Sequence, residues 1–237
     1  MDDSTGLSAR SSRGRRALVI DDEIHLASMI AGYLRREGFD VDLAGDGQQA
    51  LDKARAEHPD LVILDLGLPE LDGVELCREL RTFSDCYVIM VTARAGEADK
   101  LRGLAAGADD YITKPFSPRE LVARVEVMFR RPRSGRPVGD LVIGDLTIDR
   151  PRREVRLAGA PLELTPIEFD VLAALGARRD TVLTRRQILD IVWGESWVGD
   201  ENLVDVHIGH LRRKLSDGPG NRRYLHTVRG VGFRIGE

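Results

Sequence analysis

Three aspartates of this chain are placed where they could hold a divalent cation beside a nucleophilic carboxylate. Asp21 and Asp22 follow the apolar run 17–20, and Asp65 follows the apolar run 61–64. If both runs are buried parallel strands, their carboxyl ends meet at one edge of a sheet, where such sheets bind ligands. Carboxylates gathered there repel one another unless a hard cation lies among them, and oxygen ligands suit Mg²⁺. The sequence therefore predicts a magnesium site beside Asp65.

The elements that would position these carboxylates alternate between strands and helices. The helical pattern 24–36, for example, has apolar residues at steps of three and four and is followed by the stop signal Gly38. Repeated strand and helix units predict a doubly wound, five-stranded parallel α/β sheet, at whose carboxyl edge Thr92 and Lys114 would also lie. The expected strands are 17–20, 40–44, 61–64, 87–91 and 111–113, and the capping box Ser117-Pro-Arg-Glu120 begins the helix expected after the last strand.

The second half of the chain has the pattern of a smaller α+β domain, residues 139–237. A linker rich in Pro, Gly and Arg, residues 131–138, separates it from the first domain, residues 17–130. Short alternating runs within 141–165 predict a small antiparallel sheet. Helices are expected at 166–176, 185–193 and 202–215, with capping boxes at Thr165 and Thr184, and a hairpin over 224–235 completes a winged helix.

Composition supports two domains with different partners. The 237 residues carry a net charge of −4, but 17–130 hold 13 Lys+Arg against 22 Asp+Glu, while 205–237 hold 7 against 3. A basic patch can bind nucleic acid whatever the total charge. We expect a cytoplasmic protein, because no apolar run approaches a membrane span and residues 1–16, interpreted as a disordered tail, have no signal-peptide core. Cys77 and Cys86 match no zinc or redox spacing.

The motifs, taken in order, resemble those of bacterial two-component response regulators, in the subgroup with a winged-helix output domain (the OmpR/PhoB type). The resemblance covers residues 16–236, nearly the whole chain. Any one of its motifs alone is weak, but their order is specific. They are Asp21-Asp22, Leu64-Asp65, Leu68-Pro69, Asp72-Gly73, Thr92-Ala93, the segment 107–116 and the segment 227–233.

The resemblance implies a flavodoxin-like receiver domain in which Asp65 accepts a phosphoryl group from a sensor histidine kinase. Mg²⁺ would be held by Asp22, Asp65 and the backbone carbonyl of Gly67, with Asp21 acting through water. The protein would not be an enzyme with a separate substrate. Catalysis of phosphoryl transfer then amounts to positioning and cationic stabilisation of charge.

The resemblance also assigns roles to three residues around the acceptor. Lys114 would supply the second cation, aimed by a cis bond to Pro115. Thr92 would hydrogen-bond a phosphoryl oxygen and move inward. Tyr111 would then rotate into the vacated space, which makes Thr92 and Tyr111 the switch.

Phosphorylation would favour a homodimer that binds DNA. The expected intersubunit pairs are Lys100 with Glu120, Asp109 with Arg124, and Asp110 with Arg131. Two winged helices would bind direct-repeat half-sites of double-stranded DNA about one helical turn apart, with RNA polymerase as a further partner. The expected DNA-binding residues are Trp193, His207, His210, Arg212, Arg213, Thr227 and Arg229, although Trp193 could instead serve the core.

Departures from the family pattern leave some points open. Gly209 and His210 stand where well-known relatives carry arginine, so the DNA sequence recognised is in doubt. Gly67 stands where relatives often carry a bulkier residue, so we expect a more open pocket and faster dephosphorylation.

The acidic pocket has three alternative interpretations. A Mg²⁺-dependent phosphatase would need an aspartate at position 67 as general acid. A flavin-binding domain would need a phosphate-cradling loop where Asp21-Asp22-Glu23 stands. A regulator that works without phosphorylation would not need the full set of Asp65, Thr92 and Lys114.

Overall fold

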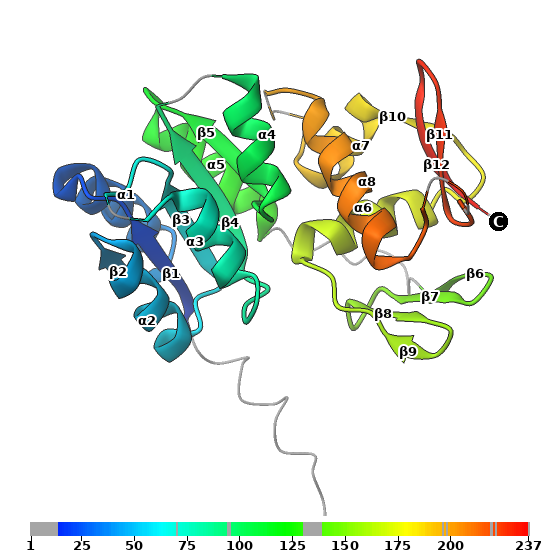
Figure 1. Cartoon of the computed structure of the whole chain (residues 1–237), viewed down its shortest axis with the longest axis horizontal. Helices are drawn as coiled ribbons and strands as arrows, with labels where there is room; N and C mark the ends of the chain where they lie inside the picture. The colour runs from blue at the N-terminus through cyan, green and yellow to red at the C-terminus, as the bar shows by residue number, and fades with distance from the viewer. Residues whose placement is uncertain are drawn as a thin grey trace, which may run out of the picture.

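The first domain is the parallel sheet predicted from the sequence. The computed structural model describes residues 14–69, 71–93, 96–129, 139–195, 197, 199–218, 220 and 222–236. The sheet order is β2-β1-β3-β4-β5, with all neighbouring strands parallel (Figure 1). The strands are β1 (Arg15–Ile20), β2 (Phe39–Ala44), β3 (Leu61–Asp65), β4 (Tyr87–Thr92) and β5 (Asp110–Thr113).

Two expected segments lie wholly or partly outside the described residues. β1 begins at Arg15, inside the range expected for the N-terminal tail. Residues 1–13 of that tail and the expected linker 131–138 lie outside the described residues.

Helices cover both faces of this sheet. α1 contacts α5, whereas α2 contacts α3 and α3 contacts α4. Every residue of β3 and β4 is buried, as expected for strands covered on both faces. The helices are α1 (Ile24–Arg36), α2 (Gly47–Glu57), α3 (Gly73–Leu80), α4 (Glu97–Ala105) and α5 (Pro118–Met128).

A glycine lets α3 begin close beside the end of β3. Asp72 caps this helix by accepting a hydrogen bond from the Val74 amide at 3.1 Å. A Cβ atom at Gly73 would lie 2.7 Å from the carbonyl oxygen of Asp65. Since real Cβ atoms do not approach backbone oxygen so closely, the Asp72-Gly73 motif fixes the loop that follows Asp65.

The second domain is a winged helix preceded by a four-stranded antiparallel sheet (Figure 1). The preceding sheet contains β6 (Leu141–Ile143), β7 (Leu146–Asp149), β8 (Glu154–Leu157) and β9 (Ala160–Pro161). The helices are α6 (Pro166–Gly176), α7 (Arg185–Val192) and α8 (Asn202–Lys214). The wing is a hairpin of β11 (Leu225–Val228) and β12 (Gly232–Ile235), with β10 (Leu183–Thr184) on the other side of β12.

Side-chain caps set the starts of these helices. The capping boxes predicted at Thr165 and Thr184 are both complete, so α6 and α7 begin where the sequence indicates. The capping box predicted for α5 is not formed, although Ser117 does cap the helix. Ser117 accepts a hydrogen bond from the Arg119 amide, but the Glu120 carboxylate binds Arg124 at 2.9 Å instead of reaching back.

Candidate functional site

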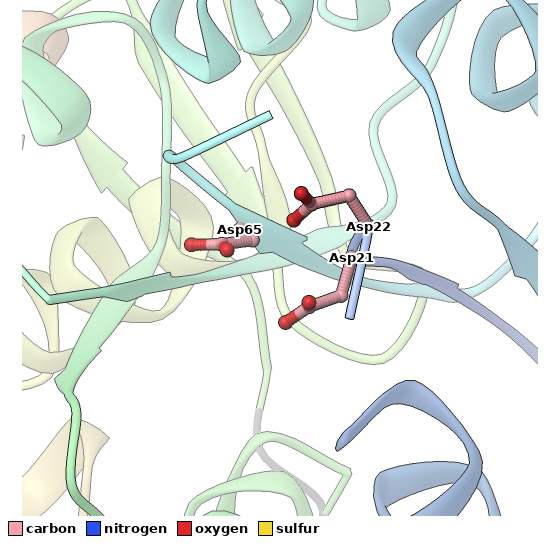
Figure 2. Close-up of side chains that lie close together, drawn as sticks. All are labelled: Asp21, Asp22 and Asp65. Carbon is pink, nitrogen blue, oxygen red and sulfur yellow. The ribbon is translucent and has the colours of Figure 1, made fainter. Parts of the chain in front are cut away.

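The three aspartates lie together at the carboxyl edge of the parallel sheet. Ile20 of β1 pairs with Leu64 of β3. The residues that follow them in the sequence, Asp21 and Asp65, are therefore neighbours. One carboxylate oxygen from each of Asp21, Asp22 and Asp65 lies within 4.8 Å of the others (Figure 2). Asp21 and Asp65 are buried, and Asp22 is exposed. The predicted cluster is therefore formed, with one member open to solvent.

Lys114 brings a cation to this cluster from the end of β5. Its Nζ donates to Asp65 Oδ2 at 2.9 Å and to Asp21 Oδ2 at 3.1 Å. The Lys114–Pro115 peptide bond is cis, as expected. Burial disfavours the charged amine, but the hydrogen bonds that it donates to Asp65 and Asp21 outweigh burial and raise the pKa of Lys114. Lys114 is thus held as a cation against the reactive carboxylate.

Burial also acts on the carboxylate beside Asp65. It is the largest cause that raises the pKa of Asp21, and the like charge of Asp65 adds to it. Hydrogen bonds from the Glu23 amide and from Lys114 oppose the shift. This close packing of negative charge is the condition that a divalent cation relieves.

These residues fit Mg²⁺. Opposite ligands in an octahedral site with bonds of 2.0–2.1 Å are about 4.2 Å apart. Oxygens within 4.8 Å of one another therefore need only a small adjustment to share one ion. All three donors are carboxylates, which this hard cation prefers.

Thr92 and Gly67 complete the surroundings of Asp65. Thr92 ends β4 and is buried, so its hydroxyl lies at the same sheet edge. The Gly67 amide donates to Asp65 Oδ1 at 3.2 Å, and a Cβ atom at Gly67 would lie 3.4 Å from Asp65 Oδ2. The side chain missing at position 67 would therefore adjoin the acceptor oxygen, as the sequence suggested.

The second domain docks against the side of the first domain that carries α4, β5 and α5. α8 packs beside α4, and the Arg124 guanidinium of α5 lies 5.4 Å from the ring centroid of Trp197 (Figure 1). We call the polar groups that meet there the docking contact. It consists of Thr165, Trp197, Asp200 and His207 against Asp109, Asp110 and Tyr111.

Each polar interaction of the docking contact is long. Thr165 Oγ1 donates to the Asp109 carboxylate at 3.3 Å. Trp197 Nε1 donates to the Asp110 carboxylate at 3.3 Å, and the Asp200 amide donates to the Tyr111 hydroxyl at 3.4 Å. His207 Nε2 lies 3.3 Å from the Asp109 carbonyl oxygen. Ordinary N–H···O bonds are about 2.9 Å long, so the docking contact is polar but weak.

Tyr111, the expected switch residue, belongs to this contact. Its ring is 8% exposed and lies 5.0 Å from the Lys100 ammonium, measured to the ring centroid. Its hydroxyl reaches Asp200 of the second domain. A rotation of Tyr111 toward Thr92 would therefore remove one bond of the docking contact.

Four of the charged residues expected to pair between subunits have partners within this chain, namely Asp109, Asp110, Glu120 and Arg124. Asp109 binds Arg81 at 2.6 Å, and both Asp110 and Glu120 bind Arg124 at 2.9 Å. Asp109 and Asp110 have no exposed surface, because the second domain covers them. In this arrangement they are not available to a second subunit, contrary to the simple expectation. Arg131 lies outside the described residues.

The expected DNA-binding residues fall into two groups. Thr227 and Arg229 are exposed on the wing, and Arg213 is exposed on α8. Arg212 is half-buried and donates to the Leu225 carbonyl at 2.9 Å and to Thr227 Oγ1 at 2.8 Å, so it braces the wing. The expectation that Arg212 is free for DNA is therefore corrected for this arrangement.

The second group consists of Trp193, His207 and His210. The expectation that they contact DNA is also corrected for this arrangement. They are 3%, 1% and 7% exposed, so none can reach DNA in this arrangement. The sequence places the two histidines on the polar side of α8, but that side packs against the first domain. Sequence reasoning also missed Trp197 and Asp200, whose only local signal was a large aromatic in a glycine-containing loop.

Comparison with known proteins agrees with this geometry. Residues 17–126 match the family described as response regulator receiver domain, and residues 159–235 match the family described as transcriptional regulatory protein, C terminal. The chain is 43% identical to the alkaline phosphatase synthesis transcriptional regulatory protein PhoP of Bacillus subtilis, covering 94% of this chain and 97% of that protein. The chain is a two-component response regulator of the OmpR/PhoB type.

Other relatives of this response regulator give the same result. The DNA-binding response regulator MtrA of Mycolicibacterium smegmatis is 46% identical over 94% of this chain and 97% of its own length. The solved structure of DrrB, an OmpR/PhoB homologue from Thermotoga maritima, has 31% identity and a TM-score of 0.52, covering 95% of this chain and all of that one. The family and fold predicted from the sequence are confirmed.

The function of the response regulator follows at the level of the family. It is a transcription regulator switched by phosphorylation, and not an enzyme with a separate substrate. Regulators of this family work with sensor histidine kinases and bind DNA, and their receiver domains bind Mg²⁺ in the acidic pocket. No helix in the described part of the chain has the length and apolar character needed to span a membrane.

Proposed function

We propose that Asp65 accepts the phosphoryl group from a sensor histidine kinase and that this event releases the second domain to bind DNA. The observation that carries the proposal is Lys114, which reaches from β5 to Asp65 at 2.9 Å. The same strand carries Asp110 and Tyr111, to which the second domain is bound. β5 and Lys114, the residue that follows it, therefore connect the docking contact to Asp65.

The chemistry at Asp65 needs charge stabilisation and positioning. The carboxylate attacks phosphorus, and negative charge spreads over the phosphoryl oxygens in the transition state. Lys114 lies where it can stabilise that charge, and the Thr92 hydroxyl can hydrogen-bond the product. Asp21, Asp22, Asp65 and the Gly67 carbonyl would hold Mg²⁺, which would supply the divalent charge.

A phosphoryl group would then weaken the docking contact. It adds about −1.5 to −2 charges and three acceptor oxygens beside Thr92. Movement of Thr92 toward it leaves space for the Tyr111 ring, whose hydroxyl would leave the Asp200 amide. Because the remaining interactions are also long, the loss of one shifts a nearly balanced equilibrium.

Release would free two surfaces at once. The side formed by α4, β5 and α5 becomes available to a second subunit, so the pairs of Lys100 with Glu120, Asp109 with Arg124 and Asp110 with Arg131 can form by exchange. The docked second domain and a second subunit need the same carboxylates, so docking and dimerisation exclude each other.

The freed winged helix would bind direct-repeat half-sites of double-stranded DNA. Release exposes the side of α8 that carries His207 and His210, beside the exposed Arg213. Arg229 at the turn of the wing would enter the minor groove, and Thr227 and Arg212 would support it. Trp193 would contribute its indole N–H once uncovered.

The remaining partners and the location of the protein are also part of this proposal. RNA polymerase is the further partner expected of a DNA-bound dimer, and the protein acts in the cytoplasm. The units that carry these functions are the receiver, residues 17–130, and the DNA-binding domain, residues 139–237.

Intact mass and DNA affinity test the proposal together. Wild type treated with a small-molecule phosphodonor and Mg²⁺ should gain one phosphoryl group, elute as a dimer and bind repeat DNA more tightly. Asp65→Asn should show none of these changes. Phosphorylation of Asp65→Asn, or dimer and DNA binding that ignore the phosphoryl group, would refute it.

A further inference from the structure

Two histidines of α8 lie buried against the receiver. His207 is 1% exposed and His210 is 7% exposed, and their ring centroids are 6.0 Å apart. His207 also lies 5.4 Å from the ring of Trp193. His207 is part of the docking contact, and both histidines lie on α8, which packs beside α4 of the receiver, so their surroundings change when the domains separate.

The hydrogen bonds of these rings suit their neutral forms. His207 Nε2 faces the Asp109 carbonyl oxygen, which accepts a hydrogen bond from it, and its Nδ1 has no partner among the described residues. His210 Nδ1 lies 3.6 Å from Glu168, and its Nε2 likewise finds no partner in the described part of the chain. A second N–H on either ring would therefore be buried without an acceptor, which is costly.

The carboxylates beside the two rings are already bound to other cations, although Glu168 also lies 3.6 Å from His210 Nδ1. Asp109 is bound by Arg81 at 2.6 Å and Glu168 by Lys214 at 2.7 Å. The titratable and charged groups on the elements that pack around the two rings are Arg81 after α3, Lys100 on α4, Asp109 and Asp110 on β5, Glu168 on α6, and Arg213 and Lys214 on α8.

We propose that His207 and His210 form a proton-sensitive latch, so that acidification releases the DNA-binding domain from the receiver without phosphorylation. The latch rests on the proposed function in one respect, namely that the docked arrangement is the inactive one. It adds a second input, the proton, to the input from the kinase.

The direction of the effect follows from burial. Burial, followed by the nearby His210, lowers the pKa of His207 from its ordinary 6.5 to about 3. Burial also lowers the pKa of His210, partly offset by Glu168. Docking is therefore at full strength above pH of about 6.5 and weakens as the pH falls from there toward 3. Between pH 7.5 and 5.5, one such histidine shifts the ratio of docked to released protein about tenfold.

Protonation of Asp109 has the opposite effect on docking to protonation of the two histidines, and it offsets part of their effect. Burial raises its pKa to about 6, so protonation of Asp109 would favour the buried state. However, its bonds from Arg81 and from the Val88 amide lie within the receiver and persist after release. Thr165, Glu168 and the cover that the second domain gives Asp109 are lost on release, so Asp109 opposes part of the response of the two histidines as the pH falls below about 6.

The test measures domain separation in the full, unphosphorylated chain by small-angle X-ray scattering between pH 7.5 and 5.5. His207→Gln keeps a donor for the Asp109 carbonyl but cannot be protonated, and His210→Gln removes the second titrating ring. His226→Gln is the matched control, because the His226 ring also meets a backbone oxygen, at 3.2 Å, but within the wing. Near-UV circular dichroism at each pH verifies that both domains stay folded.

Wild type and His226→Gln should expand as the pH falls, with the ratio of docked to released protein decreasing up to about tenfold through His207 and further through His210. His207→Gln should lose most of this response, and the double variant should lose all of it. Wild type that stays compact at pH 5.5, or a double variant that opens along the same curve, would overturn the latch.

If His207→Gln is poorly folded, the histidine pKa values read by NMR in wild type decide the question. Two rings with values well below 6.5 support the latch, and two ordinary values overturn it. Asp65→Asn, which cannot be phosphorylated, should still open with acid. A latch that works while phosphorylation fails to open the chain would refute the proposed function alone.

Discussion

Lys114 contacts Asp65, the proposed acceptor, from the end of the strand that also carries Tyr111 of the docking contact. Its ammonium lies between the carboxylates of Asp65 and Asp21, and those two interactions raise its pKa against the effect of burial. A charge held in place before the reaction needs no reorganisation when negative charge develops. The effect of Lys114 should therefore appear in the rate of phosphorylation more than in the fold.

Lys114→Gln should slow phosphorylation by a small-molecule phosphodonor about 10²-fold, as for loss of one preorganised charge-stabilising group. Lys53→Gln is the control, because Lys53 donates to the Leu43 carbonyl, away from the pocket. Intact-mass time courses measure both rates. Equal rates for Lys114→Gln and wild type would contradict the role of the ammonium.

Gly67 leaves the acceptor open on one side. A Cβ there would lie 3.4 Å from Asp65 Oδ2, and the φ of Gly67 lies outside the left-handed region, so a side chain fits without backbone strain. Gly67→Met should hinder attacking water and lengthen the half-life of the phosphorylated protein several-fold. Gly45→Met, where a side chain meets nothing within 4 Å, is the control. An unchanged half-life in Gly67→Met would sink this explanation.

The residues of the pocket were predictable because their positions depend on a simple rule. Parallel strands end at a common edge, so Asp21, Asp65, Thr92 and Lys114 had to meet there. The partners of His207 were not predictable, because helical periodicity gives only the polar side of α8. Whether that side faces DNA or the receiver depends on domain packing.

At the scale of elements, the N-terminus of α6 also contacts the receiver domain. Thr165 caps this helix through the Glu168 amide and also donates to Asp109 of the receiver. Thr184 caps α7 in the same way through Gln187, without reaching the receiver. The two capping boxes are therefore matched in structure but differ in their relation to docking.

Thr165→Ala and Thr184→Ala should each lower the free energy of unfolding of the second domain by about 1 kcal/mol. Only Thr165→Ala should also increase DNA binding by the unphosphorylated protein, since it alone removes a bond of the docking contact. Denaturant melts and fluorescence anisotropy on repeat DNA measure the two effects. Equal DNA affinity in the two variants would count against a docking role for Thr165.

The elements were predictable where local sequence decides them. The helix expected at 24–36 is found over those residues, and the helix expected at 202–215 ends at Lys214. The capping box of α5 failed because Arg124, one turn further on, captures Glu120. Such competition between side chains is decided by their three-dimensional positions, which the motif alone does not contain.

At the scale of the whole molecule, one strand links chemistry to output. β5 ends beside Lys114 at the acceptor and presents Asp110 and Tyr111 to the second domain. The docked domain covers carboxylates that a second subunit would need and buries part of the helix that would meet DNA. Under the proposed function, the docked arrangement would therefore oppose dimerisation and DNA binding together, a property that neither domain's sequence pattern predicts alone.

The most direct test of this account is the separation of the two domains on phosphorylation, measured by small-angle X-ray scattering at pH 7.5. With a phosphodonor and Mg²⁺, wild type at a concentration too low for dimers should change from a compact to an extended particle. Asp65→Asn, and wild type with a chelator in place of Mg²⁺, should stay compact. Phosphorylated wild type that remains compact, with mass spectrometry showing the phosphoryl group on Asp65, would contradict the account.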